Sequence, residues 1–445
     1  MALSAKNEEP ISRSHGWYAV TLLTVAYALS LLDRQLIAVL VEPIKAQFGV
    51  SDTQIGLLQG FSFAVLYSLV GIPLGRLADS SVHRVRLAAA GIILWSAMTT
   101  LSALVRNFGT LFACRVGVGI GEASLSPAAV SLIGDYFGRS NLGRAIGVYQ
   151  TGSYVGSGVA LSLGSAVLYS LTMLGPIELG AGVQLAPWQM TLLICGLPGV
   201  LLGLLVCFSV REPPRASDAP ARPELLRDGP SAWDFILKER KVAVPLLAAM
   251  GFIAAMQYAF FAWVPTLFTR RFGWEIREIG VAFGAIALVT GATVPVLAGW
   301  MHDRAMRSHG IRGTFGVALG FTALQVGYMI APILDSPYAA LTFLALGVTG
   351  STALGPVLNA MLQVVTPGHL RGQVMAIAIF CGVMFGYTLG PLGIGIGNDF
   401  VFRDELSIHK SLVLMAVTCI PVIGFALSFG WMTSRRLPPL LSAAH

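Results

Sequence analysis

The chain has 445 residues, of which 55% are hydrophobic and only 11% are charged, and its formal net charge is +7. A soluble domain carries about 25% charged residues, and uncharged stretches such as 145–177 and 336–369 exceed the roughly 20 residues that cross a bilayer, which excludes a soluble protein. Nucleic-acid binding does not explain the positive charge, because most Lys and Arg residues fall in loops and tails expected on one side of a membrane. The composition predicts an all-α polytopic membrane protein.

Twelve membrane-spanning helices are expected from the apolar runs, in two groups of six. The expected organisation is a tail at 1–16, a first six-helix bundle at 17–210, a linker at 211–241, a second bundle at 242–434 and a tail at 435–445. The linker is polar, and a short amphipathic helix is expected in it near 233–240. The excess of Lys and Arg in the linker, tails and inner loops predicts cytoplasmic N- and C-termini.

Two helices of the first half are expected to carry charged residues in mid-span. Asp33-Arg34 lies in the first helix, and Arg115 and Glu122 lie in the fourth. Each such charge costs ~2.5–3.5 kcal/mol at the centre of a membrane helix, so these residues are candidates for function. Counted from the helix ends, the Asp33-Arg34 pair and Arg115 lie at similar depths, which predicts that they meet. Glu122, two helical turns or about 10 Å from Arg115, is expected deeper, nearer the inner side.

The two halves of the chain repeat one another. The run from Gly75 to Asp79 after the second helix is echoed by the run from Gly299 to Asp303 after the eighth. Parallel halves of six helices are typical of secondary transporters that bind substrate near the midplane, between the halves.

The chain resembles the major facilitator superfamily over nearly its full length. The motifs that carry this resemblance are Gly75-Arg-Leu-Ala-Asp79, its second copy Gly299-Trp-Met-His-Asp303-Arg304, and Arg115, Gly117-Val-Gly119 and Pro127 in the fourth helix. The first half is most similar to the Spinster-type lipid transporters, through Leu-Leu-Asp33-Arg34, Trp95-Ser96 and Val118-Gly-Ile-Gly-Glu122-Ala-Ser. The resemblance implies alternating access and proton-linked or facilitated movement of amphipathic lipids, such as lysophospholipids or sphingosine phosphate.

The charged residues in the spans suggest a mechanism. We expect an anionic headgroup to bind Arg34, Arg115 or both, and Asp33 or Glu122 to take up and release the coupling proton. A permanent structural ion-pair network is the alternative interpretation of these four residues.

The second half is expected to carry no charge within its spans. A cavity with one charged and one apolar wall suits an amphipath with an anionic head and an alkyl tail. Polar residues expected to complete the substrate site are Gln150, Gln257, Tyr258, Asn359 and Gln363, and Tyr387 is a further cavity candidate. Hydrogen bonding between helices is the alternative role for these residues.

Charged residues near the inner ends of the helices are expected to form a gate that closes in the outward-open state. They are Asp79, Arg84, Arg144, Asp303, Arg304 and Arg371. The alternative is that they are solvated and only set the topology.

The expected function is therefore transport, with a proton symporter of a small organic anion as the alternative. A membrane enzyme or a sensor is less expected, because no nucleotide-binding loop, catalytic residue set or metal-ligand spacing occurs. We expect no cofactor and no metal, and the five cysteines all lie in apolar runs. The expected partners are protons, an anionic lipid or small molecule, and the lipid bilayer, with the protein acting as a monomer in a bacterial inner membrane.

Overall fold

The computed structural model describes residues 12–79, 83–137, 139–178, 184–214, 231–367 and 370–434, which are mostly helical. The helices of the first half are α1 (Arg13–Val39), α2 (Val41–Phe48), α3 (Asp52–Gly56), η1 (Leu57–Phe61), α4 (Ser62–Asp79), α5 (Arg84–Leu101), η2 (Ser102–Leu104), α6 (Phe108–Glu122), α7 (Leu125–Tyr136), α8 (Arg139–Leu174) and α9 (Pro187–Ser209). An antiparallel hairpin of β1 (Ile177–Glu178) and β2 (Gln184–Leu185) lies between α8 and α9.

The second half begins with α10 (Ala232–Lys238), at the place of the expected amphipathic helix. It continues with α11 (Arg240–Phe272), α12 (Ile276–Leu324), α13 (Val326–Ile330), η4 (Ala331–Ile333), α14 (Pro337–Val365), α15 (Arg371–Val383), η5 (Met384–Leu389), α16 (Gly390–Ile396), η6 (Gly397–Phe402), η7 (Glu405–Ser407) and α17 (Ile408–Thr433). Most of the expected tails and the middle of the expected linker lie outside the described residues.

Eleven helical segments of the described chain are long and apolar enough to cross a membrane. One of them, Ile276–Ile333, has 58 residues. That length corresponds to about 87 Å of helix, whereas the hydrocarbon core of a bilayer is ~30 Å thick. The segment breaks at Gly310, whose φ of 62° and ψ of −157° are not helical. The break divides it into two crossings, which accounts for all twelve of the expected helices.

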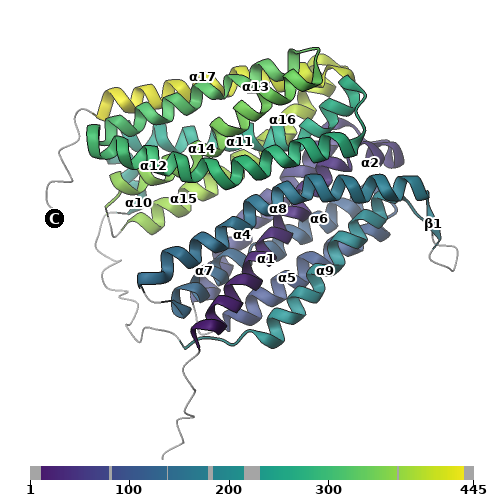
Figure 1. The fold of residues 1–445 in the computed structure, drawn as a ribbon, viewed down its shortest axis with the longest axis horizontal. Coiled ribbons are helices and arrows are strands. Elements are labelled where there is room, and N and C mark those ends of the chain that lie inside the picture. Colours follow the sequence, from purple (N-terminus) through teal and green to yellow (C-terminus); the bar gives the residue numbers. More distant parts are fainter. Residues whose placement is uncertain are drawn as a thin grey trace, which may run out of the picture.

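The two halves lie side by side and converge at the end of the molecule that carries α2, β1 and α16 (Figure 1). We call the end near the first and last described residues the terminal end, and the end at which the halves converge the opposite end. One buried hydrophobic cluster, which includes Val20 and Ile92, lies wholly in the first half. A second cluster crosses between the halves at the opposite end, where it includes Ile44 of α2 and Phe268 of α11. The halves are therefore packed together mainly at the opposite end.

Prolines divide two of the expected helices. The first expected helix ends as α1 at Val39, because the ring of Pro43 would clash with the carbonyl group of Val39 in a continuous helix. The fourth expected helix is divided into α6 and α7. Pro127 has no N–H group to donate to the carbonyl oxygen of Ala123, and its ring would clash with that carbonyl group in a continuous helix.

Three π-helical segments of the described chain, η1, η5 and η6, lie in the second and eleventh crossings and were not expected from sequence. Two of them, η1 and η5, pack against each other across the two halves. A Cβ atom on Gly60 would come within 1.8 Å of the carbonyl oxygen of Tyr387, so only glycine permits this approach. Rare π-helical turns occur frequently at functional sites, and Tyr387 indeed lies in the interior between the halves.

Candidate functional site

Four charged residues form a buried cluster on α1 and α6. The exposed fractions of Asp33, Arg115 and Glu122 are 2%, 3% and 2%. Arg34 Nε donates a hydrogen bond to Glu122 Oε2 at 2.6 Å, and Ser30 Oγ donates to the same oxygen at 2.7 Å. Further hydrogen bonds to its oxygens stabilise a buried ion pair; Ser30 supplies one to Oε2, whereas Oε1 has no partner among the described residues.

The direction of the helices explains why Arg34 reaches Glu122. Side chains on a helix tilt toward its N-terminus. Because α1 runs away from the terminal end and α6 runs toward it, the two side chains tilt toward one another. The depths expected from sequence count only the positions of Cα atoms. They therefore place Arg34 and Glu122 farther apart than the ends of their side chains are.

Arg115 occupies a different environment. Its Nη2 donates to the backbone carbonyl oxygen of Asp33 at 3.2 Å, so the expected meeting of these two residues occurs through the backbone. The carboxylate of Asp33 accepts a hydrogen bond from Thr99 Oγ1 at 3.2 Å. The buried Nε and Nη1 of Arg115 have no partner among the described residues. Buried donors of this kind are normally satisfied by water or a ligand.

Aromatic rings surround the guanidinium group of Arg34. Its Cζ lies 4.2 Å from the centroid of the Phe63 ring, and its Nη1 donates to the Tyr387 hydroxyl at 2.9 Å. The ring of Tyr387 stacks on that of Tyr258, with centroids 3.7 Å apart. Arg34 thus joins Glu122 in the first half to Tyr387 in the second half.

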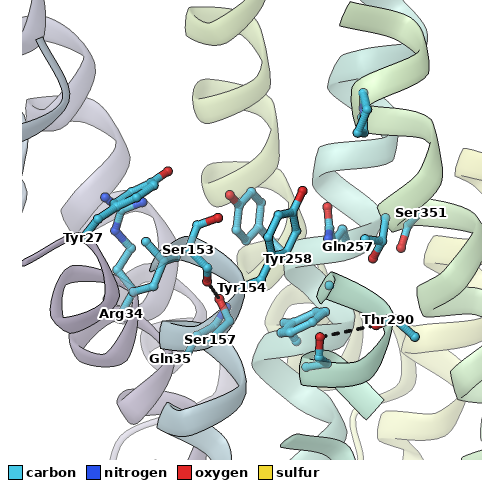
Figure 2. Close-up of a pocket in the computed structure, with 17 residues that line it drawn as sticks. Tyr27, Arg34, Gln35, Ser153, Tyr154, Ser157, Gln257, Tyr258, Thr290 and Ser351 are labelled. Atoms are coloured by element: carbon cyan, nitrogen blue, oxygen red, sulfur yellow. Dashed lines mark hydrogen bonds between the residues drawn. The ribbon is translucent and has the colours of Figure 1, made fainter. Parts of the chain in front are cut away.

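A cavity of about 230 Å³ lies between the two halves beside Arg34. Figure 2 shows its polar side chains facing one another from both halves. They are Tyr27, Arg34, Gln35, Ser153, Tyr154 and Ser157 from the first half, and Gln257, Tyr258, Thr290, Ser351 and Thr352 from the second. Arg34 is the one charged residue among the described residues on this lining. The expected asymmetry of charge is present, but the wall of the second half is polar rather than apolar.

The structure brings only some of the expected substrate residues together. Arg34, Gln257 and Tyr258 line the central cavity, and Arg115 is buried away from its lining. Gln150 lines a separate cavity between α8 and α12. Asn359 is half-buried and Gln363 is exposed, and neither lines the central cavity.

Several polar residues of the cavity were not among those predicted from sequence; they include Gln35, Ser153 and Ser157. Gln35 follows Asp33-Arg34 directly inside an apolar run, and this position was a usable signal. The two serines lie among several small residues of α8 that also suit helix packing, so their spacing alone did not distinguish them.

A second charged network joins the halves at the opposite end, and sequence analysis missed it too. Asp52 is fully buried, and its Oδ2 accepts hydrogen bonds at 2.7 Å from Arg270 Nη1 and from Asn398 Nδ2. Lys45 pairs with Asp52 and also with Glu405, the latter at 2.9 Å. Among the described side chains, every ion pair between the two halves lies at this end.

At the terminal end, Arg84 binds residues of the first half and of the start of the linker. Its Nε donates to Glu212 Oε1 at 2.7 Å, and its Nη1 pairs with Asp135. The second oxygen of Glu212 accepts the backbone N–H of Val85 at 2.8 Å. This arrangement fastens the chain that leaves α9 to the start of α5.

Among the described side chains, the other expected gate residues form no ion pair with one another in this conformation. Arg144 lies over the Trp17 ring at 5.5 Å, Arg371 Nε donates to its neighbour Thr366 at 3.2 Å, Asp303 and Arg304 are exposed, and the side chain of Asp79 lies outside the described residues. The gate at the terminal end therefore stays a prediction about another conformation.

Comparison with known proteins places this geometry in context. Residues 23–391 match the family model of the Major Facilitator Superfamily. An efflux pump of this superfamily from Mycolicibacterium smegmatis is 28% identical over 94% of this chain and 93% of its own length. The D-galactonate transporter of Escherichia coli is 24% identical over 92% of this chain and 95% of its own. The sphingosine-1-phosphate transporter of Danio rerio is 28% identical over 57% of this chain and 47% of its own.

Solved structures agree on the fold. A bacterial homologue of the human lysosomal transporter Spinster, in an inward-facing and unoccupied conformation, superposes with a TM-score of 0.78 at 24% identity. The alignment covers 96% of this chain and 98% of that one. These relatives are transporters and pumps rather than enzymes. The chain is a membrane transporter that belongs to the major facilitator superfamily and resembles its Spinster proteins.

Proposed function

We propose that this transporter is proton-coupled and moves an amphipathic anion of the lysophospholipid or sphingosine-phosphate class. The observation that carries the proposal is the position of Arg34. Its guanidinium group pairs with the buried carboxylate of Glu122 on one side and lines the central cavity on the other. A single positive group at the cavity thus has two alternative partners, an acid of the protein and an anion of the substrate.

The proposed coupling follows from this competition. When Glu122 binds a proton, it loses its charge and its attraction for Arg34. Arg34 then offers its charge and its donors to an anionic headgroup in the cavity. When Glu122 releases the proton, it recovers Arg34 and displaces the anion. Asp33, whose carboxylate is also buried and lies beside Arg115, is the second candidate proton carrier.

The charge distribution supports a cytoplasmic location for the terminal end. With that orientation, the state described here is inward-facing, because the halves are joined at the outer, opposite end. In the alternate state, we propose that Asp79, Arg84, Arg144, Asp303, Arg304 and Arg371 close the inner side. We further propose that the protein acts as a monomer in a bacterial inner membrane, in keeping with its bacterial relatives.

The substitution Glu122→Gln tests the proton-coupling role. It keeps the shape of the side chain but removes the titrating group. In proteoliposomes with an imposed proton gradient, we expect the variant to lose the pH dependence of transport. Transport of a radiolabelled lysophospholipid, measured across a pH series, checks this.

The matched control is Glu178→Gln, at an exposed position on the hairpin. This variant should retain the wild-type pH profile, and both variants should have wild-type elution profiles in detergent. A wild-type pH profile for Glu122→Gln would refute the assignment of the proton to Glu122.

Symport of a small organic anion is the second candidate. The cavity of about 230 Å³ favours it, because pockets for larger ligands usually measure about 300–1,000 Å³. The D-galactonate transporter among the relatives favours it as well. Uptake and competition distinguish the two: under the lipid proposal the protein takes up lysophospholipid and excess D-galactonate leaves that uptake unchanged, whereas under the small-anion proposal it takes up D-galactonate and no lysophospholipid.

A further inference from the structure

A second cavity, larger and more apolar than the central one, lies between α8 and α12. Its volume is about 630 Å³. The residues on its lining are mostly apolar or small, with Gln150, Thr151 and Thr293 as its polar members apart from Tyr154. Val155, Val289 and Val296 line it and are 46%, 63% and 73% exposed, so the cavity opens on the surface that faces the bilayer.

The packing of α8 against α12 explains where this cavity forms. Toward the opposite end, the two helices are in close contact through glycines. A Cβ atom on Gly158 would lie 2.2 Å from Leu288 Cγ, and one on Gly284 would lie 2.2 Å from Ser162 Oγ. Toward the terminal end, from Val155 to Gly147 on α8, the two helices leave a groove between them.

Tyr154 and Gly291 line both this groove and the central cavity. A Cβ atom on Gly291 would lie 2.7 Å from Cδ1 of the Tyr154 ring, so the ring rests directly on the backbone of α12. The side chain of Tyr154 is half-buried. It therefore forms the partition between a polar cavity that contains Arg34 and an apolar groove that opens to lipid.

We propose that the groove between α8 and α12 holds the hydrocarbon tail of the transported molecule while its anionic head lies beside Arg34, with Tyr154 as the wall between head and tail. This inference rests on the proposed function and specifies its substrate as a molecule with one long chain. The central cavity is too small for such a molecule, whereas the adjoining groove supplies apolar space next to it. Rotation of the Tyr154 side chain would join the two spaces.

Photolabelling and transport together test the proposal. The probe is oleoyl lysophosphatidylglycerol with a diazirine at the end of its chain, incorporated with the full-length protein in liposomes. We expect the label on groove residues of α8 and α12, and we expect unlabelled oleoyl lysophosphatidylglycerol to compete it away. If the label on these residues persists with this competitor but decreases when ordinary diacyl lipid is added, the groove holds a chain of a bilayer lipid. That result would overturn the proposal.

The variant Ala292→Trp provides the functional test, because Ala292 lies on the lining of the groove and is exposed. A tryptophan there should fill the groove and reduce transport of the oleoyl substrate about tenfold or more through steric exclusion. Transport of the octanoyl analogue, whose chain is much shorter, should change little. The matched control is Val281→Trp, an exposed position of α12 outside the groove, which should leave both substrates unaffected.

The outcomes separate this inference from the function on which it rests. If the wild-type protein carries no oleoyl lysophosphatidylglycerol but does carry D-galactonate, the lipid function fails and the tail site fails with it. If the wild-type protein carries the lipid and Ala292→Trp does so equally well, with label outside the groove, only the tail site fails.

Discussion

Arg34 shows how much of this site depends on the reach of one side chain. Arg34 and Arg115 both lie inside membrane spans and are indistinguishable as sequence signals. In the structure, Arg34 contacts Glu122, Ser30, Tyr387 and several aromatic rings, whereas Arg115 donates only to the backbone of Asp33 among the described residues. A planar guanidinium group can serve several partners in different directions at once, and a lysine ammonium group on a flexible stem does so less well.

The substitution Arg34→Lys should therefore impair transport although it keeps the charge. Hydrogen bonds to charged groups contribute about 1.5–3 kcal/mol, so loss of one of them should lower the transport rate roughly tenfold or more. Initial rates of lysophospholipid uptake in proteoliposomes measure this effect. Arg115→Lys is the comparison, with a smaller decrease expected; equal losses in the two variants would contradict the separate roles.

At the scale of elements, the contact between η1 and η5 connects the charged cluster to the second half. Gly60 lets the two π-helical segments approach, and this approach places the Tyr387 hydroxyl beside Arg34. A change at Glu122 can thus reach the second half through Arg34 and Tyr387, although the described residues of that half on the cavity lining carry no charge.

The substitution Tyr387→Phe removes the hydroxyl group but keeps the ring that stacks on Tyr258. We expect transport to fall roughly tenfold, since the variant loses one hydrogen bond to a charged group. Uptake kinetics at saturating substrate measure the effect. The control is Tyr18→Phe, which removes a hydroxyl that donates to Ser209 within the first half, away from the cavity, and should cost little transport. Wild-type rates in Tyr387→Phe would show that this bond plays no part in coupling.

The crossings were predictable from sequence because each apolar run exceeds the thickness of a bilayer, and the four buried charges were conspicuous in such runs. Three features were not predictable. The break after Val39 depends on one proline, Pro43, whereas a proline inside another crossing, Pro73 in α4, leaves its helix unbroken. The π-helical turns depend on contacts between Gly60 and Tyr387, which lie far apart in the sequence. Asp52 and Arg270 are at the ends of apolar runs, where charged residues are ordinarily solvated.

At the scale of the whole molecule, the network around Asp52 and the shared hydrophobic cluster hold the two halves together at the opposite end. Removal of one partner from a buried ion pair costs about 3–5 kcal/mol, because it leaves the other charge uncompensated. Arg270 is one such partner of the fully buried Asp52, but Lys45 stays paired with Asp52 when Arg270 is removed, so the cost should be smaller than this. The stability of the present conformation therefore depends on this residue.

The substitution Arg270→Gln should shift the population toward the state that is open at the opposite end. Ala262 is buried between the halves. A single cysteine at this position, in a variant from which the native cysteines have been removed, reports this opening. We expect its reaction with a membrane-impermeant thiol reagent to accelerate at least about tenfold, which corresponds to about 1.4 kcal/mol. Arg271→Gln is the control, since Arg271 binds only residues of the second half among those described. Unchanged labelling in Arg270→Gln would show that the network does not restrain the halves.

The buried cluster has an electrical consequence as well. With both acids and both bases ionised, the formal charges of Asp33, Arg34, Arg115 and Glu122 sum to zero. Under the proposed coupling, one proton and one monovalent anion add a further sum of zero. A membrane potential does work of about 2.3 kcal/mol per 100 mV on each elementary charge that crosses it, and neither the empty nor the loaded carrier presents such a charge at this cluster. Transport of a monoanion would then respond to the pH difference across the membrane and be indifferent to its voltage.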